Sequence, residues 1–127
     1  MNDSFCVFES VDDVEILIAD YRGCDVFEFL RRLRIVRDQI VLRPPASALV
    51  LTLAAGVGYS PEGMRELVTI LRETKPHVAA SAVVGLGHLT LLVNVINRLS
   101  GREVQAFENI DEARRWLRKS ATRAAGD

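Results

Sequence analysis

The sequence predicts a single α/β domain whose five-stranded sheet is mostly parallel, with one antiparallel strand at an edge. Segments rich in β-branched residues alternate with segments of helical hydrophobic period. Two strand-like segments come before the first helix. The order is strand, strand, helix, strand, helix, strand, helix, strand, helix, so the strands that are joined through helices should lie parallel. The 127 residues are enough for one hydrophobic core.

The first third of the chain predicts a hairpin and a helix. Residues 5–9 and 14–20 are rich in Val, Ile and Phe, and the four residues between them, 10–13, form the connection. Residues 25–42 then change to helical spacing, with a glycine before them and two prolines after them. A helix of about four or five turns is expected here.

The middle of the chain predicts two buried strands separated by a helix. Residues 48–53 and 78–84 are continuous apolar runs of the kind found in strands that are covered on both faces. Ser60 and Pro61 supply a capping hydroxyl and a first helical residue that needs no N–H. We expect this helix to face the core with Met64, Leu67, Val68 and Leu71.

The last third predicts a helix, a short strand and a final helix. Residues 89–99 have an apolar arc wider than one sheet contact requires. Residues 103–107 form the strand, and Asp111 caps the final helix. Residues 120–127 are expected to be a frayed tail of the single domain, which spans 1–127.

Composition narrows the class of protein. A net charge of −1 and a pI near 6.1 argue against a general nucleic-acid binder. Two cysteines, Cys6 and Cys24, are too few for a disulfide framework, and the N-terminus has no secretory pattern. The uncharged stretch 77–97 is interrupted by glycines, as a strand leading into a helix would be, so no transmembrane span is expected. These features predict a cytoplasmic protein with free thiols, no metal and no cofactor.

Four stretches resemble the SpoIIAA-like family of STAS/SEC14-type domain proteins. They are residues 45–52 (PASALVLT), 75–85 (KPHVAASAVVG), 97–102 (NRLSGR), and Phe107 with 111–117 (DEARRWL). The resemblance extends from about residue 14 to residue 117. It implies a STAS-like sheet with helices packed against it. It also implies relatives of two kinds: anti-sigma-factor antagonists, which act by protein binding and serine phosphorylation, and SEC14-type domains, which hold lipids.

The phosphorylation motif implied by this resemblance is only partly retained. The Asp-Ser-Ser-Gly-like motif of antagonist STAS domains aligns with residues 60–63, which keep Gly63 but place Glu62 at the phosphoacceptor position. A fixed carboxylate therefore stands where a phosphate would be added. Ser60 remains open to modification, and its plainer reading is a helix N-cap.

Candidate ligand contacts lie beyond the carboxyl ends of the predicted parallel strands, where open sheets bind ligands. Gly85 and Gly87 follow a strand and could place free amides near an anion or polar head group, with His88 as a neutral partner. Tight strand-to-helix packing would explain the same glycines. The predicted ligand or anion contacts are Tyr21, Tyr59, Ser60, Gly85, Gly87 and His88.

Candidate partner contacts lie on two helices. The outer side of the first helix interleaves basic and apolar residues, which suits an acidic partner or an anionic membrane surface. A solvated helix with a few exposed apolar residues is the plainer alternative. The predicted partner surface comprises Phe27, Arg31, Arg34, Ile35, Leu42, Leu91 and Val95.

These features favour recognition over catalysis, because few titratable groups converge at the strand ends. The first expectation is a non-catalytic STAS-like module that acts by protein contact, including homodimer formation. The alternative is SEC14-like binding of a lipid or other apolar small molecule. An exposed flat apolar patch would favour the first. An enclosed cavity on the order of several hundred Å³ would favour the second.

Overall fold

The five strands form one mixed sheet in the order in which they occur along the chain. The computed structural model describes residues 4–126 and, within that range, all side chains except those of residues 11, 88, 89 and 122–126. The first two strands pair antiparallel at one edge, and all later pairs are parallel, as predicted. The strands are β1 (Cys6–Val11), β2 (Val14–Asp20), β3 (Ala48–Leu53), β4 (Val78–Val84) and β5 (Gln105–Phe107).

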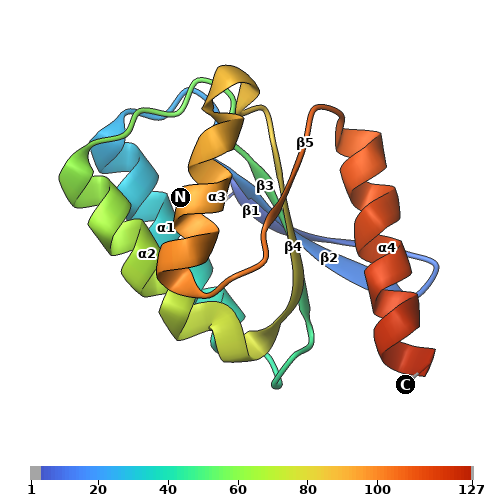
Figure 1. The fold of residues 1–127 in the computed structure, drawn as a ribbon. Coiled ribbons are helices and arrows are strands. Elements are labelled where there is room, and N and C mark those ends of the chain that lie inside the picture. The colour runs from blue at the N-terminus through green and yellow to red at the C-terminus, as the bar shows by residue number, and fades with distance from the viewer. Residues whose placement is uncertain (1–3, 127) are drawn as a thin grey trace.

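Three helices cover one face of the sheet and a fourth covers the other (Figure 1). Parallel strands added always on the same side, through crossovers of one hand, place every connecting helix on the same face. The last helix is free of that constraint and packs on the opposite face. The helices are α1 (Val26–Ile40), α2 (Pro61–Thr74), α3 (Leu91–Ser100) and α4 (Ile110–Gly126), with short 3₁₀ turns at Lys75–His77 and Gly87–Thr90.

The hairpin turn is tighter than the sequence suggested. The strand β1 continues to Val11, which pairs directly with Val14, so only Asp12 and Asp13 lie in the connection. Both have positive φ angles, 52° and 65°. A two-residue turn of this kind matches the twist of the strands, and Asp tolerates the left-handed conformation better than most residues. The predicted four-residue connection was therefore wrong.

Helix ends follow the local capping chemistry. The Asp25 side chain accepts a hydrogen bond from the Glu28 N–H at 2.8 Å and caps α1, which ends at Ile40 rather than at the predicted residue 42. Helix α3 begins at Leu91, two residues later than predicted, because a 3₁₀ turn comes first. It ends at Ser100, and the C-cap residue Gly101 has a φ of 74°, which glycine readily adopts.

The C-terminal elements differ from the prediction in two details. Strand β5 begins at Gln105 rather than at residue 103. The Asn109 side chain, not that of Asp111, caps α4: its Oδ1 accepts from the N–H groups of Asp111 at 2.7 Å and Glu112 at 3.2 Å. Helix α4 extends to Gly126, and the fraying expected from residue 120 stays a prediction.

Strand β3 and the second half of β4 are buried on both faces, as their continuous apolar sequences predicted. In β3, Leu49 and Leu51 face α4, while Val50 faces α1 and α2. Beneath α4, Leu51 and Leu117 are almost inaccessible to solvent. The face beneath α4 is thus closely covered, and the other face contains the candidate site.

Candidate binding cavity

An apolar cavity of about 150 Å³ lies between the sheet and helices α1, α2 and α3. Its walls are mainly aliphatic and aromatic side chains. From the helices come Phe29, Leu33, Val36, Ile40, Met64, Leu67, Ile70, Leu92, Val93 and Ile96; from the sheet and its loops come Val50, Ala54, Val57, Val83, Leu86 and Val104.

The cavity arises because facing side chains are too short to meet. Helix α3 buries only Val93 and Ser100 among its described residues. Val93 packs against Val83 of β4 and Ala54, which follows β3, and the short side chain of Ser81 also lines the space. Packed protein interiors seldom leave such space, because each unfilled volume loses dispersion contacts.

The same space explains a difference from the predicted core face of α2. Of the four residues expected to be buried there, Met64, Leu67 and Leu71 line the cavity and stay half-buried. Ile70 is the large apolar residue of α2 that is fully buried. The inward side of this helix therefore faces a space, not a closed core.

One charged side chain lies deep in the wall of the cavity. Arg102 follows α3, and only 8% of its surface is exposed. Its Nη1 donates to Thr74 Oγ1 at 2.9 Å and to the Leu71 carbonyl oxygen at 3.3 Å, and its Nη2 donates to Ser81 Oγ. Burial lowers the pKa of Arg102 to about 10, because the charged form loses hydration.

Two predicted ligand contacts, Tyr21 and Tyr59, meet at this cavity. Tyr21 is buried and packs edge-to-face on Phe29, with ring centroids 5.0 Å apart. Burial raises the pKa of its hydroxyl well above the usual value. Tyr59 is more exposed and lies beyond β3, so it contributes to the outer part of the wall.

Ser60 is the N-cap of α2. Its Oγ accepts a hydrogen bond from the Gly63 N–H at 3.0 Å, and Pro61 occupies the first turn. This is the plainer of the two roles that the sequence allowed. Ser60 is not among the residues that line the cavity.

The Gly85 to His88 segment does not open α3 directly. It leads into the 3₁₀ turn, which Thr90 closes by donating from Oγ1 to the Gly87 carbonyl oxygen at 2.7 Å. Gly85 has a φ of 95°, and a Cβ atom there would lie 2.9 Å from the Ala55 nitrogen, so close backbone packing requires this glycine. The His88 side chain lies outside the described residues, and its predicted role stays untested.

The structure separates the residues that were predicted to form a partner surface on the outer side of α1. Phe27 and Leu42 are 85% and 77% exposed, but Phe27 lies in the first turn of α1 and Leu42 lies beyond its last residue, so the length of the helix, about 20 Å at 1.5 Å per residue, separates them. Ile35, predicted to be on this surface, is half-buried against the core cluster beneath α1. Ile35 is thus only partly accessible from the outer side of α1, and its predicted role in a partner surface stays a prediction.

The basic residues of α1 are largely paired. Arg31 and Arg32 both donate to Glu28, at 2.7 Å, and these hydrogen bonds lower the pKa of Glu28 to about 2. Arg34 forms an ion pair with Glu66 of α2 at 2.8 Å. Neighbouring carboxylates thus offset much of the positive charge predicted for this surface.

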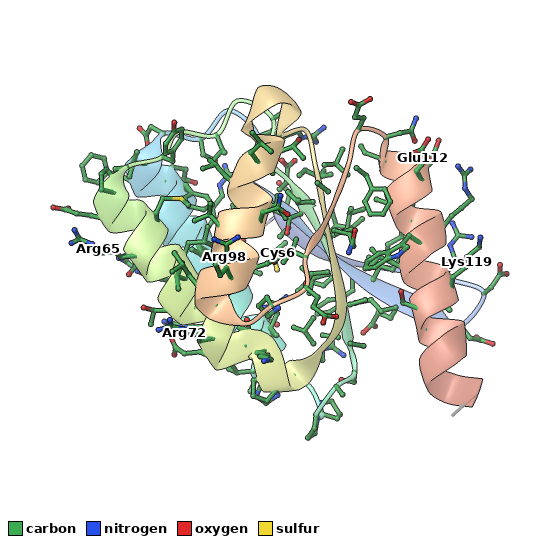
Figure 2. All side chains as sticks on the ribbon, viewed as in Figure 1. Cys6, Arg65, Arg72, Arg98, Glu112 and Lys119 are labelled. Carbon is green, nitrogen blue, oxygen red and sulfur yellow. The ribbon has the colours of Figure 1, made fainter. Side chains whose placement is uncertain are left out.

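Helix α3 carries the clearer exposed apolar surface. Leu91 is 76% exposed, and Val95 and Leu99 are about half exposed. Their spacing of four residues places them along one stripe of the helix. Arg98 lies on the same helix (Figure 2), and Arg72 of α2 donates from its Nε to the Leu99 carbonyl oxygen at 3.0 Å.

The polar residues at the end of β2 form a local turn. Arg22 and Asp20 form an ion pair at 2.8 Å, and these contacts lower the pKa of Asp20. Cys24 is buried, and burial raises the pKa of its thiol. Among the described residues there is no group of three or more His, Cys, Asp or Glu side chains placed to bind a metal.

Sequence reasoning missed the three polar residues that meet in the cavity wall: Thr74, Ser81 and Arg102. Ser81 carried a usable signal, since it is the hydroxyl within an otherwise apolar strand. Arg102 carried none, because an arginine after a helix-ending glycine is ordinarily solvated. Its burial depends on contacts with residues 21 to 31 positions earlier.

Comparisons with known proteins leave the family open. No protein-family model, curated protein or solved structure matches the chain or its fold. In the part of the chain that the structure describes, each helix is too short or too polar to cross a lipid bilayer.

Proposed function

We propose that this protein is a non-catalytic, STAS-like binding module that holds a small apolar molecule between its sheet and α3. The observation that carries this proposal is the cavity of about 150 Å³ with almost entirely hydrophobic walls. Binding sites for small molecules are typically concave and mostly apolar, with a few placed polar groups. Tyr21, Tyr59 and Arg102 are such groups here.

The volume limits the ligand. It is smaller than the several hundred Å³ expected for a lipid-sized ligand, and an apolar cavity of about this size accommodates benzene. The ligand is therefore a molecule of roughly six to eight non-hydrogen atoms, or one short end of a longer chain. Because α3 is only shallowly buried, its displacement is the simplest way to enlarge the site.

The test combines identification of a natural ligand with titration of a simple one. Native mass spectrometry of protein purified from its own host, followed by organic extraction, should reveal a bound small apolar molecule. The ligand-depleted protein should then bind 1-hexanol, with NMR shifts confined to residues around the cavity. Absence of both a co-purified molecule and hexanol binding would refute the proposal.

A second candidate function is self-association through α3, favoured by the exposed stripe of Leu91, Val95 and Leu99. Leu91→Glu with Val95→Glu should convert a dimer to a monomer in sedimentation velocity, because the two charges would be buried at the contact. Leu42→Glu is the control, since Leu42 is equally exposed but lies after α1 and not on α3. A wild-type protein that is monomeric at high concentration would rule this function out.

A further inference from the structure

We propose that the ligand of the cavity is a small monocarboxylate, with its hydrocarbon part among the apolar side chains and its carboxylate on Arg102. This inference rests on the proposed binding function and assigns the chemical class of its ligand. It starts from the unusual position of a guanidinium in an apolar wall. Arginine is almost never fully buried unless it is paired.

The hydrogen-bond acceptors of the Arg102 guanidinium among the described residues are all uncharged. They are the hydroxyls of Thr74 and Ser81 and the backbone carbonyl of Leu71, and no carboxylate of a described residue lies within ion-pair distance. The carbonyl belongs to the last turn of α2, where the helix dipole supplies about half a negative charge. A full counter-charge is therefore still missing at a site where leaving a cation unpaired is costly.

The donors left over suit a carboxylate. The hydrogen bonds of Arg102 to described residues use both Nη1 hydrogens and one from Nη2, which leaves Nε–H and one Nη2–H. Two donors on one guanidinium can hold the two oxygens of a carboxylate. Hydrocarbon atoms attached to that carboxylate would enter the adjoining cavity.

The other arginine of the cavity wall provides a contrast. Arg37 also lines the space, but its Nε donates to Asp38 Oδ1 at 3.1 Å, so it already has a counter-ion. The two side chains differ in pairing and in burial. Of these two arginines, Arg102 is the buried one, and it forms no ion pair with a carboxylate of the described residues.

The experiment compares hexanoate with 1-hexanol, which share a six-carbon chain and differ in the head group. We expect NMR titration at neutral pH to give hexanoate about tenfold tighter binding, since charge-assisted hydrogen bonds are the stronger ones. Hexanoate, but not hexanol, should shift the Arg102 Nε–H resonance. Equal binding of the two probes, or tighter binding of hexanol, would overturn the inference.

Two variants extend the test. Arg102→Met should abolish the preference for the acid while keeping hexanol binding, and Arg98→Met, a control at an exposed arginine of α3 outside the cavity wall, should keep the preference. A preference that survives in Arg102→Met would overturn the inference. If Arg102→Met fails to fold, the wild-type preference and the Arg102 resonance decide the question. Binding of hexanol without preference refutes only the carboxylate, whereas binding of neither probe refutes the proposed function itself.

Discussion

Ala54 and Ala82 form a matched pair of positions that tests whether the space beside the sheet is empty. Ala54 follows β3 and lines the cavity, whereas Ala82 lies in β4 beneath α4, on the opposite face. Both side chains are buried. Substitution by Val adds the same two carbon atoms at each site, so the two variants differ in the surroundings of those atoms.

The expected effects have opposite signs. At about 0.8 kcal/mol for each buried carbon, Ala54→Val should raise the free energy of unfolding by up to about 1.6 kcal/mol. Unfolding entropy near 2.1 cal/mol/K per residue converts this to an increase in Tm of about 6 °C. At Ala82 no space is available, so Val should cost about 1–3 kcal/mol through overpacking.

Urea unfolding followed by circular dichroism gives both free energies, and hexanol titration gives the functional effect. Ala54→Val should weaken hexanol binding because its added carbons occupy part of the site, while Ala82→Val should leave the affinity unchanged. Equal destabilisation by both variants would mean that the cavity is already filled. Stabilisation by Ala54→Val without loss of binding would place the ligand elsewhere.

Three further predictions concern the fold. Gly85→Ala should lower the free energy of unfolding by about 1–3 kcal/mol in urea titrations, because the new Cβ would strain a left-handed residue and meet the Ala55 nitrogen. Glu28 has a lowered pKa, so its contribution to folding stability is present above its unfolded pKa near 4.5 and is lost as the pH falls towards 2. When Tm is measured against pH, the decrease in Tm over this window should therefore be smaller for Glu28→Gln than for the wild-type protein. Asn109→Ala should cost about 1 kcal/mol in unfolding free energy and Asp111→Ala less than about half of that, because Asn109 provides the cap; the reverse order would contradict this.

The fold could be predicted because its determinants are local. The apolar runs of β3 and β4 match the observed strands at both ends, and the start of α2 was set by Ser60 and Pro61. Errors fell where two local signals compete. Asn109 and Asp111 are both good caps, and the sequence does not say which of them the preceding strand places over the free N–H groups of α4.

The site could be predicted only in outline, because a cavity is a property of side chains that meet from distant parts of the chain. The wide apolar arc of residues 89–99 indicated that more hydrophobic surface was present than one contact requires, and the structure divides that surface between an exposed stripe and the cavity wall. How much space remains depends on the short side chains of Ala54 and Ser81 facing α3, which no periodicity encodes. The burial of Arg102 has the same origin: the turn after α3 carries it beneath the end of α2, where two hydroxyls and one carbonyl receive it. Because three elements assemble the environment of Arg102, its neighbours in sequence do not reveal it. A charged group held in such an assembled apolar site in turn indicates the kind of ligand that the site binds.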